Sequence, residues 1–303
     1  MAVKTEPVPS RNPNHSPVQP VFRFAPSPNG FLHLGHAYSA LLNARLAREM
    51  GGRFLVRIED IDTIRCTEDR VAACLEDLEW LGLDWEQPVL RQSTQFDRYR
   101  AVAADLEARR LLYPCFCSRN DIAQAAGANR LHDPDGALVY PGTCRALDAT
   151  TRAARRASGE PFALRLDMAA ALARIGTRRF EWQEVSGERL ENVTDIAARP
   201  EKWGDVVLVR KETPTSYHLA VAVDDALQGI THVVRGTDLY EATAIHRVLQ
   251  TLLGLPEPRY HHHALIRDEA GKKLAKSLAS TPLRQLRADG VTAAEIRKRL
   301  GFG

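Results

Sequence analysis

The stretch FAPSPNGFLHLGH, residues 24–36, joins two different hydrophobic patterns through a turn rich in proline and glycine. Residues 21–24 form a short apolar run typical of a strand, and residues 37–50 carry apolar side chains at helical spacing. Residues 53–58, RFLVRI, then alternate as a strand does. These segments predict a strand–helix–strand unit of an open parallel α/β sheet, with a ligand crevice at the carboxyl ends of its strands.

Two blocks of regular α/β texture flank a less regular segment. Helical patterns at residues 67–81 and 95–112 assign residues 21–114 to the first half of the sheet domain. Residues 115–200 contain three cysteines, several turns and many arginines, and are predicted to be an insertion. Regular texture then returns with a strand at 205–210, a helix at 216–227, a strand at 231–235 and a helix at 239–253. The remaining predicted blocks are a disordered leader at 1–20, the second half of the domain at 201–280, and short C-terminal helices at 281–303.

The composition is that of a globular protein with one main domain. The 303 residues are 44% hydrophobic and carry a net charge of +3, so contacts with nucleic acid must come from local patches. No segment has the roughly 20 apolar residues of a membrane span, and the leader lacks the apolar core of a signal peptide. We therefore expect a cytoplasmic protein without a membrane partner, and a monomer. Five cysteines are too few for a disulfide scaffold, which leaves core thiols or metal ligands.

The turn and the two histidines after it suit an anionic ligand. A turn between a strand and a helix presents backbone amides to an anion, and a glycine such as Gly30 allows close approach. His33 and His36 lie three residues apart on one face of the first helical turn, where their N–H groups can stabilise charge on a transferring phosphate. Two histidines at the start of a helix can also lack a binding or catalytic role. The surrounding sequence is therefore needed to choose between these interpretations.

The surrounding sequence resembles class I aminoacyl-tRNA synthetases of the glutamyl type. Residues 23–30, RFAPSPNG, and 33–36, HLGH, match the glutamyl form of the HIGH signature, whereas glutaminyl enzymes carry Pro-Pro-Glu-Pro in the turn. Residues 55–62, LVRIEDID, look like the element that binds the amino acid, with Ile61 in place of the usual threonine. The resemblance implies a Rossmann-type parallel sheet, the catalytic core of class I synthetases, carrying a zinc-binding insertion.

A lysine-rich segment near the other end, KKLAKS at residues 272–277, resembles the KMSKS loop of the same family. Lysines on a flexible loop can close over a triphosphate and neutralise charge in the transition state. Ala275 stands where the family has serine, which removes one hydroxyl contact. The catalytic residues that the resemblance implies are His33, His36, Lys273 and Lys276. Those implied for ATP binding are His33, Gly35, His36 and Lys276.

Glutamate has two carboxylates and one ammonium, so a selective pocket requires an arginine and an acid. The resemblance implies Arg23 and Arg235 for the carboxylate and Glu59 for the ammonium. The other implied pocket residues are Phe24, Ala25, Pro26, Ser27 and Tyr217. Each has an ordinary structural explanation on its own, but residues 224–236, DDALQGITHVVRG, are also similar to the family and favour a pocket.

The predicted insertion contains Cys115, Cys117 and Cys144. Three thiolates in one small insertion suit a structural, tetrahedral zinc site. On chemistry alone, His132 could be the fourth ligand, whereas the resemblance to glutamyl-queuosine synthetases implies Tyr140. Three buried thiols without zinc are the alternative.

The family resemblance covers residues 21–285, and residues 278–303 leave room only for two short helices. Full glutamyl-tRNA synthetases continue there into helical domains that read the anticodon, so the chain is similar to the glutamyl-Q tRNA(Asp) synthetase family. This implies activation of L-glutamate with ATP and Mg²⁺, and transfer to queuosine in the anticodon loop of tRNA(Asp). Eight arginines between residues 145 and 179 could contact phosphates or belong to a solvated helix. Another glutamate-activating ligase, or a non-catalytic paralogue that binds RNA, are the alternatives.

Overall fold

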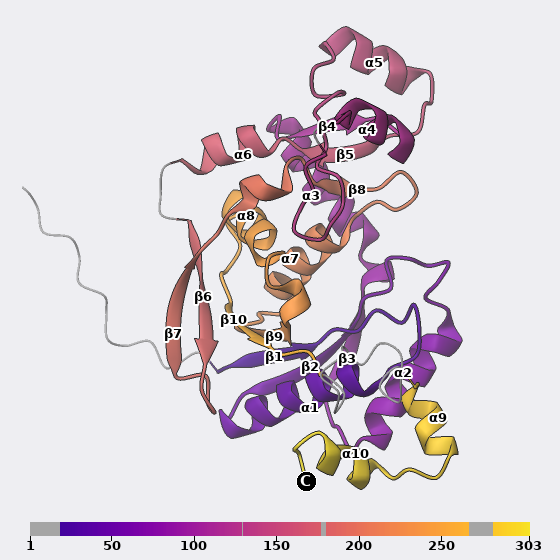
Figure 1. Cartoon of the computed structure of the whole chain (residues 1–303), viewed down its shortest axis with the longest axis vertical. Helices are drawn as coiled ribbons and strands as arrows, with labels where there is room; N and C mark the ends of the chain where they lie inside the picture. Colours follow the sequence, from indigo (N-terminus) through magenta and orange to yellow (C-terminus); the bar gives the residue numbers. More distant parts are fainter. Residues whose placement is uncertain (1–18, 129, 177–179, 267–280) are drawn as a thin grey trace, which may run out of the picture.

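The computed structural model describes residues 19–128, 130–176, 180–266 and 281–303 (Figure 1). Its main sheet has seven strands in the order β3-β2-β1-β9-β10-β6-β7. All neighbouring strands are parallel except the pair β6 and β7. The strands are β1 (Val21–Phe24), β2 (Arg53–Ile58), β3 (Glu86–Arg91), β6 (Glu181–Ser186), β7 (Asn192–Ala197), β9 (His232–Gly236) and β10 (Arg259–His263). The predicted parallel α/β sheet is confirmed.

Helices lie on both sides of this sheet (Figure 1). One side carries α1 (Leu34–Glu49), α2 (Glu68–Trp80), α9 (Leu283–Ala288) and α10 (Ala293–Arg299). The other side carries α7 (Tyr217–Leu227) and α8 (Thr243–Leu253), with α3 (Phe96–Ala108) and α6 (Met168–Ile175) packed against them. Strand β2 follows its alternating sequence, since Phe54, Val56 and Ile58 join the α1 core while Leu55 joins the opposite cluster. Among the described helices, none is both long and apolar enough to cross a bilayer.

The structure also contains a second, three-stranded antiparallel sheet. It consists of β4 (Leu112–Cys115), β5 (Ala163–Leu166) and β8 (Val207–Val209). The strand expected at 205–210 is present as β8 but belongs to this second sheet and not to the main sheet, and the helix expected to reach 112 ends at Ala108. Conversely, β6 and β7 lie within the predicted insertion and belong to the main sheet. Hydrophobic alternation identifies a strand and its two faces, but not its neighbours.

Helix α5 (Ala149–Ala157) has no buried side chain. Contacts made by its arginines therefore attach it to the rest of the insertion. Three guanidinium groups lie over aromatic rings: Arg152 over Tyr113, Arg155 over Phe116 and Arg156 over Phe162. Arg155 and Arg156 also form ion pairs with Glu160 and Glu107. Each cation–π contact contributes on the order of 0.5–1 kcal/mol at an exposed site. Arg152, Arg155 and Arg156, which could have contacted phosphates, thus contact other groups of the same chain. Arg178 and Arg179 lie outside the described residues.

The connections of the main sheet reverse direction between β1 and β9, which are adjacent and pair Phe22 with His232. After β1 the chain passes through α1 to β2, and after β9 it passes through α8 to β10 on the other side. Loops that leave in opposite directions open a crevice at the carboxyl ends of these two strands.

Candidate functional site

A cavity of about 400 Å³ opens at this reversal point. It is lined by every predicted glutamate- or ATP-binding residue that the structure describes: Arg23, Phe24, Ala25, Pro26, Ser27, His33, Gly35, His36, Glu59, Tyr217 and Arg235. These residues come from β1, the turn after it, the start of α1, the residue after β2, the start of α7 and β9. The lysine segment with Lys273 and Lys276 lies outside the described residues, so its role stays a prediction.

A buried ion-pair network supports the wall formed by β1 and β2. Arg23 Nε donates to Asp225 Oδ1 at 3.0 Å, and Arg57 Nη1 donates to the same oxygen at 2.7 Å. Arg57 Nη2 donates to Glu59 Oε1 at 3.1 Å. Burial acts to raise the pKa of Asp225, but the two guanidinium groups outweigh it and hold that pKa below its ordinary value. Glu59 Oε2 has no hydrogen-bond partner among the described residues and is available to an ammonium group.

Arg235 is a buried cation that contacts only neutral groups. Its side chain bonds Tyr217 Oη, Leu239 O, Thr243 Oγ1, His246 Nδ1 and His262 Nε2. Within the described part of the chain, no carboxylate lies at ion-pair distance from its guanidinium. Arg235 is only 5% exposed, and a buried charge without a counter-charge costs several kcal/mol. Such an arrangement is suited to an anionic ligand in the cavity.

Histidines hold this guanidinium in place. His262 accepts from Arg235 Nε at 3.2 Å and places its Nδ1 2.8 Å from Glu184 Oε2 on β6. His246 contacts both Arg235 and His218. Burial lowers the pKa of His246 well below its ordinary value and that of His218 to about 4, so both rings are neutral at pH 7. Neutral rings can accept from Arg235 without adding repulsion.

The two histidines predicted to be catalytic each have a defined tautomer. His33 Nδ1 accepts from the Gly35 amide at 3.1 Å, and His36 Nδ1 accepts from the His33 amide at 3.2 Å. Burial lowers the pKa of both, that of His36 to about 3 with a further contribution from His33. Since Nδ1 is an acceptor in each neutral ring, the proton resides on Nε2. Each ring can therefore offer one N–H donor to a phosphate oxygen without carrying a formal charge.

Several residues of this site had no predicted role. Arg57 and Asp225 fall within the quoted family-like stretches but received no role, and His246, His262 and Glu184 were not considered. A signal for Arg57 exists, because an arginine in the otherwise apolar strand LVRI must be buried with a partner. The run His261, His262 and His263 on a short strand is a comparable signal.

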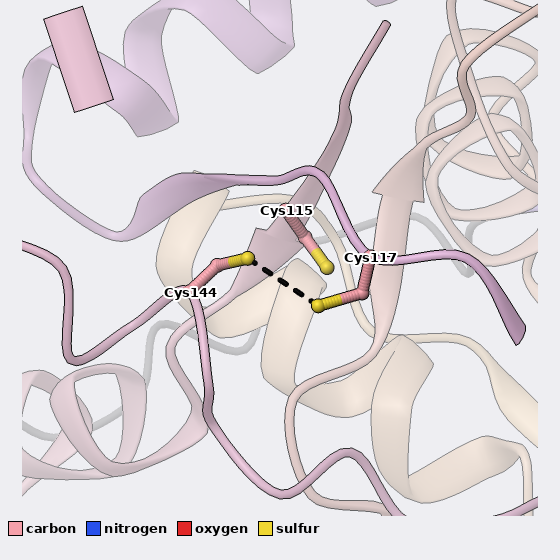
Figure 2. Close-up of side chains that lie close together, drawn as sticks. All are labelled: Cys115, Cys117 and Cys144. Carbon is pink, nitrogen blue, oxygen red and sulfur yellow. Dashed lines mark hydrogen bonds between the residues drawn. The ribbon is translucent and has the colours of Figure 1, made fainter. Parts of the chain in front are cut away.

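The three cysteines of the insertion come together (Figure 2). Their sulfur atoms lie within 4.8 Å of one another, and Cys117 Sγ is 3.5 Å from Cys144 Sγ. Tetrahedral zinc with Zn–S bonds of about 2.3 Å separates its sulfurs by about 3.8 Å, so the group has the right spacing. Tyr140 Oη lies 3.5 Å from Cys117 Sγ. His132, the alternative fourth ligand, is exposed and lies outside this group.

Comparison with known proteins agrees with this geometry. Residues 20–300 match the family of class I tRNA synthetases (E and Q), catalytic domain. The chain is 48% identical to the glutamyl-Q tRNA(Asp) synthetase of Rhodobacter capsulatus, over 93% of this chain and 100% of the relative. It is 42% identical to that of Nocardia farcinica, over 90% of this chain and 81% of the relative.

A solved glutamate tRNA ligase from Elizabethkingia meningosepticum, in complex with its amino acid, is similar with a TM-score of 0.65 and 26% identity. The match covers 82% of this chain, which spans about half the length of that structure, 50%. The chain belongs to the catalytic-domain family of class I tRNA synthetases (E and Q), within the group of glutamyl-Q tRNA(Asp) synthetases.

Proposed function

We propose that the chain activates L-glutamate with ATP and transfers the glutamyl group to queuosine at the anticodon wobble position of tRNA(Asp). The observation that carries this proposal is Arg235, a buried cation without a carboxylate partner among the described residues. A glutamate carboxylate supplies the missing charge, and Glu59 at the same cavity suits the ammonium group. The names of the relatives from Rhodobacter and Nocardia support the same substrate and acceptor.

In the first step, a carboxylate oxygen of glutamate attacks the α-phosphorus of ATP and pyrophosphate leaves. The substrate would bring Mg²⁺ with its phosphates, and the protein supplies position and hydrogen-bond donors. His33 and His36 would donate through Nε2, whereas Lys273 and Lys276 would approach from the lysine segment. In the second step, a hydroxyl of the queuosine ring attacks the mixed anhydride and releases AMP.

The test combines two assays on the purified chain. Glutamate-dependent exchange of pyrophosphate into ATP reports the first step without any tRNA. Labelled glutamate, ATP and tRNA(Asp), with or without queuosine, report the second. Periodate oxidises any free vicinal diol, so after labelling only the acylated diol survives, and digestion to nucleosides then shows whether it belongs to the base or to the terminal ribose. Exchange with glutamate and labelling of only the queuosine form are expected, whereas labelling of the ribose would make the chain an ordinary glutamate ligase.

The neutral histidine pair leads to a prediction for the first step. His36→Ala should lower kcat for pyrophosphate exchange about 100-fold, the usual cost of one donor to a developing charge. His36→Gln should retain more activity because its amide N–H can replace Nε2–H. His132→Gln, a change of an exposed histidine that does not line this cavity, is the control. Equal rates for the alanine and wild-type proteins would exclude this role.

We further propose that Cys115, Cys117, Cys144 and Tyr140 hold one structural zinc ion. The thiol spacing fits, and Cys144 already has a lowered pKa, because contacts with Tyr140 Oη and the Phe116 amide outweigh the opposing effect of burial. The ion would cross-link β4 to the segment before α5 and would take no part in the chemistry.

Metal analysis tests this proposal directly. The wild-type protein should contain one zinc per chain, and Cys144→Ser should lose most of it together with several kcal/mol of stability of the insertion. Tyr140→Phe should weaken zinc binding by about tenfold or more, measured by competition with a chelator. Unchanged zinc content in Tyr140→Phe would assign the fourth position to another ligand, such as water.

A further inference from the structure

A second cavity, of about 560 Å³, lies between the insertion and the main domain. Tyr217 and Leu239 line both this cavity and the glutamate cavity. In the proposed reaction, the acceptor hydroxyl must reach the activated carboxyl group, so the acceptor has to lie directly beside the glutamate. The second cavity occupies that position.

Two buried residues in its lining carry polar atoms without a partner. Trp203 and Ser216 are each 4% exposed, and neither Trp203 Nε1 nor Ser216 Oγ has a hydrogen-bond partner among the described residues. Ser216 precedes α7 but does not cap that helix with its side chain. Because buried polar groups are normally paired, two unpaired ones next to one cavity are unusual.

Acidic side chains line both cavities, Asp133 and Asp135 the second one and Asp238 the glutamate cavity. Asp133 Oδ1 accepts from the amides of Asp135 and Ala137 at 3.0 and 2.9 Å, which fixes the turn that presents Asp135. Partial burial raises the pKa of Asp135, and the charges of Asp133 and Asp238 raise it further. Asp238 lines the glutamate cavity. No cation among the described residues pairs with the Asp135 carboxylate, so this position favours a cationic ligand.

Arginines contribute charge of the opposite sign to the same cavity. Arg119 and Arg210 line it, and both are exposed. Neither forms an ion pair with an acid in the described parts of the chain. A ligand that carries both phosphates and a cation matches a lining with charges of both signs.

We propose that this cavity binds the acceptor nucleotide, with Asp135 pairing with an ammonium group on its base and Arg119 and Arg210 contacting its phosphates. The inference rests on the proposed function. Queuosine carries a secondary amine between its deazaguanine ring and the cyclopentenediol, and such an amine is protonated at neutral pH. Guanine has no cation at this place. Asp135 would thus select the modified base, and it would position the diol next to the glutamyl adenylate.

The test compares Asp135→Asn with Asp195→Asn, a change of an exposed carboxylate on β7. Glutamate-dependent pyrophosphate exchange should be the same in both variants and the wild type. Transfer to queuosine-containing tRNA(Asp) should fall about 10- to 100-fold in kcat/KM for Asp135→Asn only. Arg119→Gln and Arg210→Gln should raise KM for the tRNA and make it less sensitive to salt.

The outcomes separate this inference from the proposed function. Normal exchange with unchanged transfer in Asp135→Asn would overturn the assignment of Asp135 and leave the proposed function in place. Wild-type protein that forms no glutamyl adenylate, or labels no tRNA, would overturn the proposed function and this assignment with it. Loss of exchange in Asp135→Asn would also contradict the inference, because the residue would then act on the first step.

Discussion

Replacing Arg235 with methionine should abolish glutamate activation while leaving the protein folded. Truncating one member of a buried charge pair costs about 2–5 kcal/mol, so kcat/KM for glutamate in pyrophosphate exchange should fall about 10³-fold. Most of the loss should appear as a higher KM for glutamate, because the carboxylate is bound in the ground state as well. Exchange kinetics at varied glutamate concentration measure both parameters.

The stability of the same variant distinguishes a binding role from a structural one. Without ligand, Arg235 is a buried cation whose hydrogen bonds all go to neutral groups. Methionine removes these hydrogen bonds but also relieves the burial of an uncompensated charge, and the two effects oppose each other. The free energy of unfolding should therefore change by less than about 1 kcal/mol. A loss of several kcal/mol would indicate that Arg235 mainly stabilises the fold.

Arg259→Met provides the matched control, since Arg259 lies exposed at the start of β10, in the strand next to Arg235. This variant should keep wild-type exchange kinetics. The addition of glutamate should raise the melting temperature of Arg259→Met as it does for the wild type, but should have no effect on Arg235→Met. Equal stabilisation of both variants by glutamate would contradict the assignment of the carboxylate to Arg235.

Local sequence features point to residues that the structure brings together in the lining of one cavity, because most of these residues lie at strand ends or in the turns after them. The turn after β1, Glu59 after β2 and Arg235 in β9 all reach the point where the sheet connections reverse. That point is determined by strand order, because β1 and β9 are the neighbouring strands from which the connections run outward in opposite directions. The resemblance supplied the roles of these residues, and the structure brings them to one cavity.

The parts that escaped prediction depend on contacts between distant segments. Nothing local to Val207–Val209 shows that this strand pairs with β5 rather than with the main sheet. Glu184 reaches His262 from a strand 78 positions away, so neither residue alone indicates that the pair supports Arg235. The second cavity could not be predicted for the same reason. Its lining includes residues from α4 (Arg119–Ala126), the turn at Asp133 and the start of α7. A motif identifies a side chain from the residues next to it in the sequence. These residues take part in the site through contacts with residues that are distant in the sequence.

Asp225→Asn should destabilise the fold by about 3–5 kcal/mol, the usual cost of breaking a buried ion pair from one side. Asp225 is 5% exposed and receives hydrogen bonds from both Arg23 and Arg57, so asparagine leaves two buried guanidinium groups with too little negative charge. Urea unfolding at pH 7 measures the change. Asp97→Asn, whose carboxylate is 99% exposed and pairs only with Arg100, should change stability by less than 1 kcal/mol.

The pH dependence identifies the charge as the cause. The folded pKa of Asp225 is lower than its unfolded value, so its contribution is complete above the unfolded pKa, about 4, and disappears as the pH falls through the folded pKa. The stability difference between wild type and Asp225→Asn should therefore be constant from about pH 5 to 8 and shrink below about pH 4. Burial raises the pKa of Glu59, which is present in both proteins. A difference that stays constant below pH 3 would mean that packing, rather than the carboxylate charge, accounts for the loss.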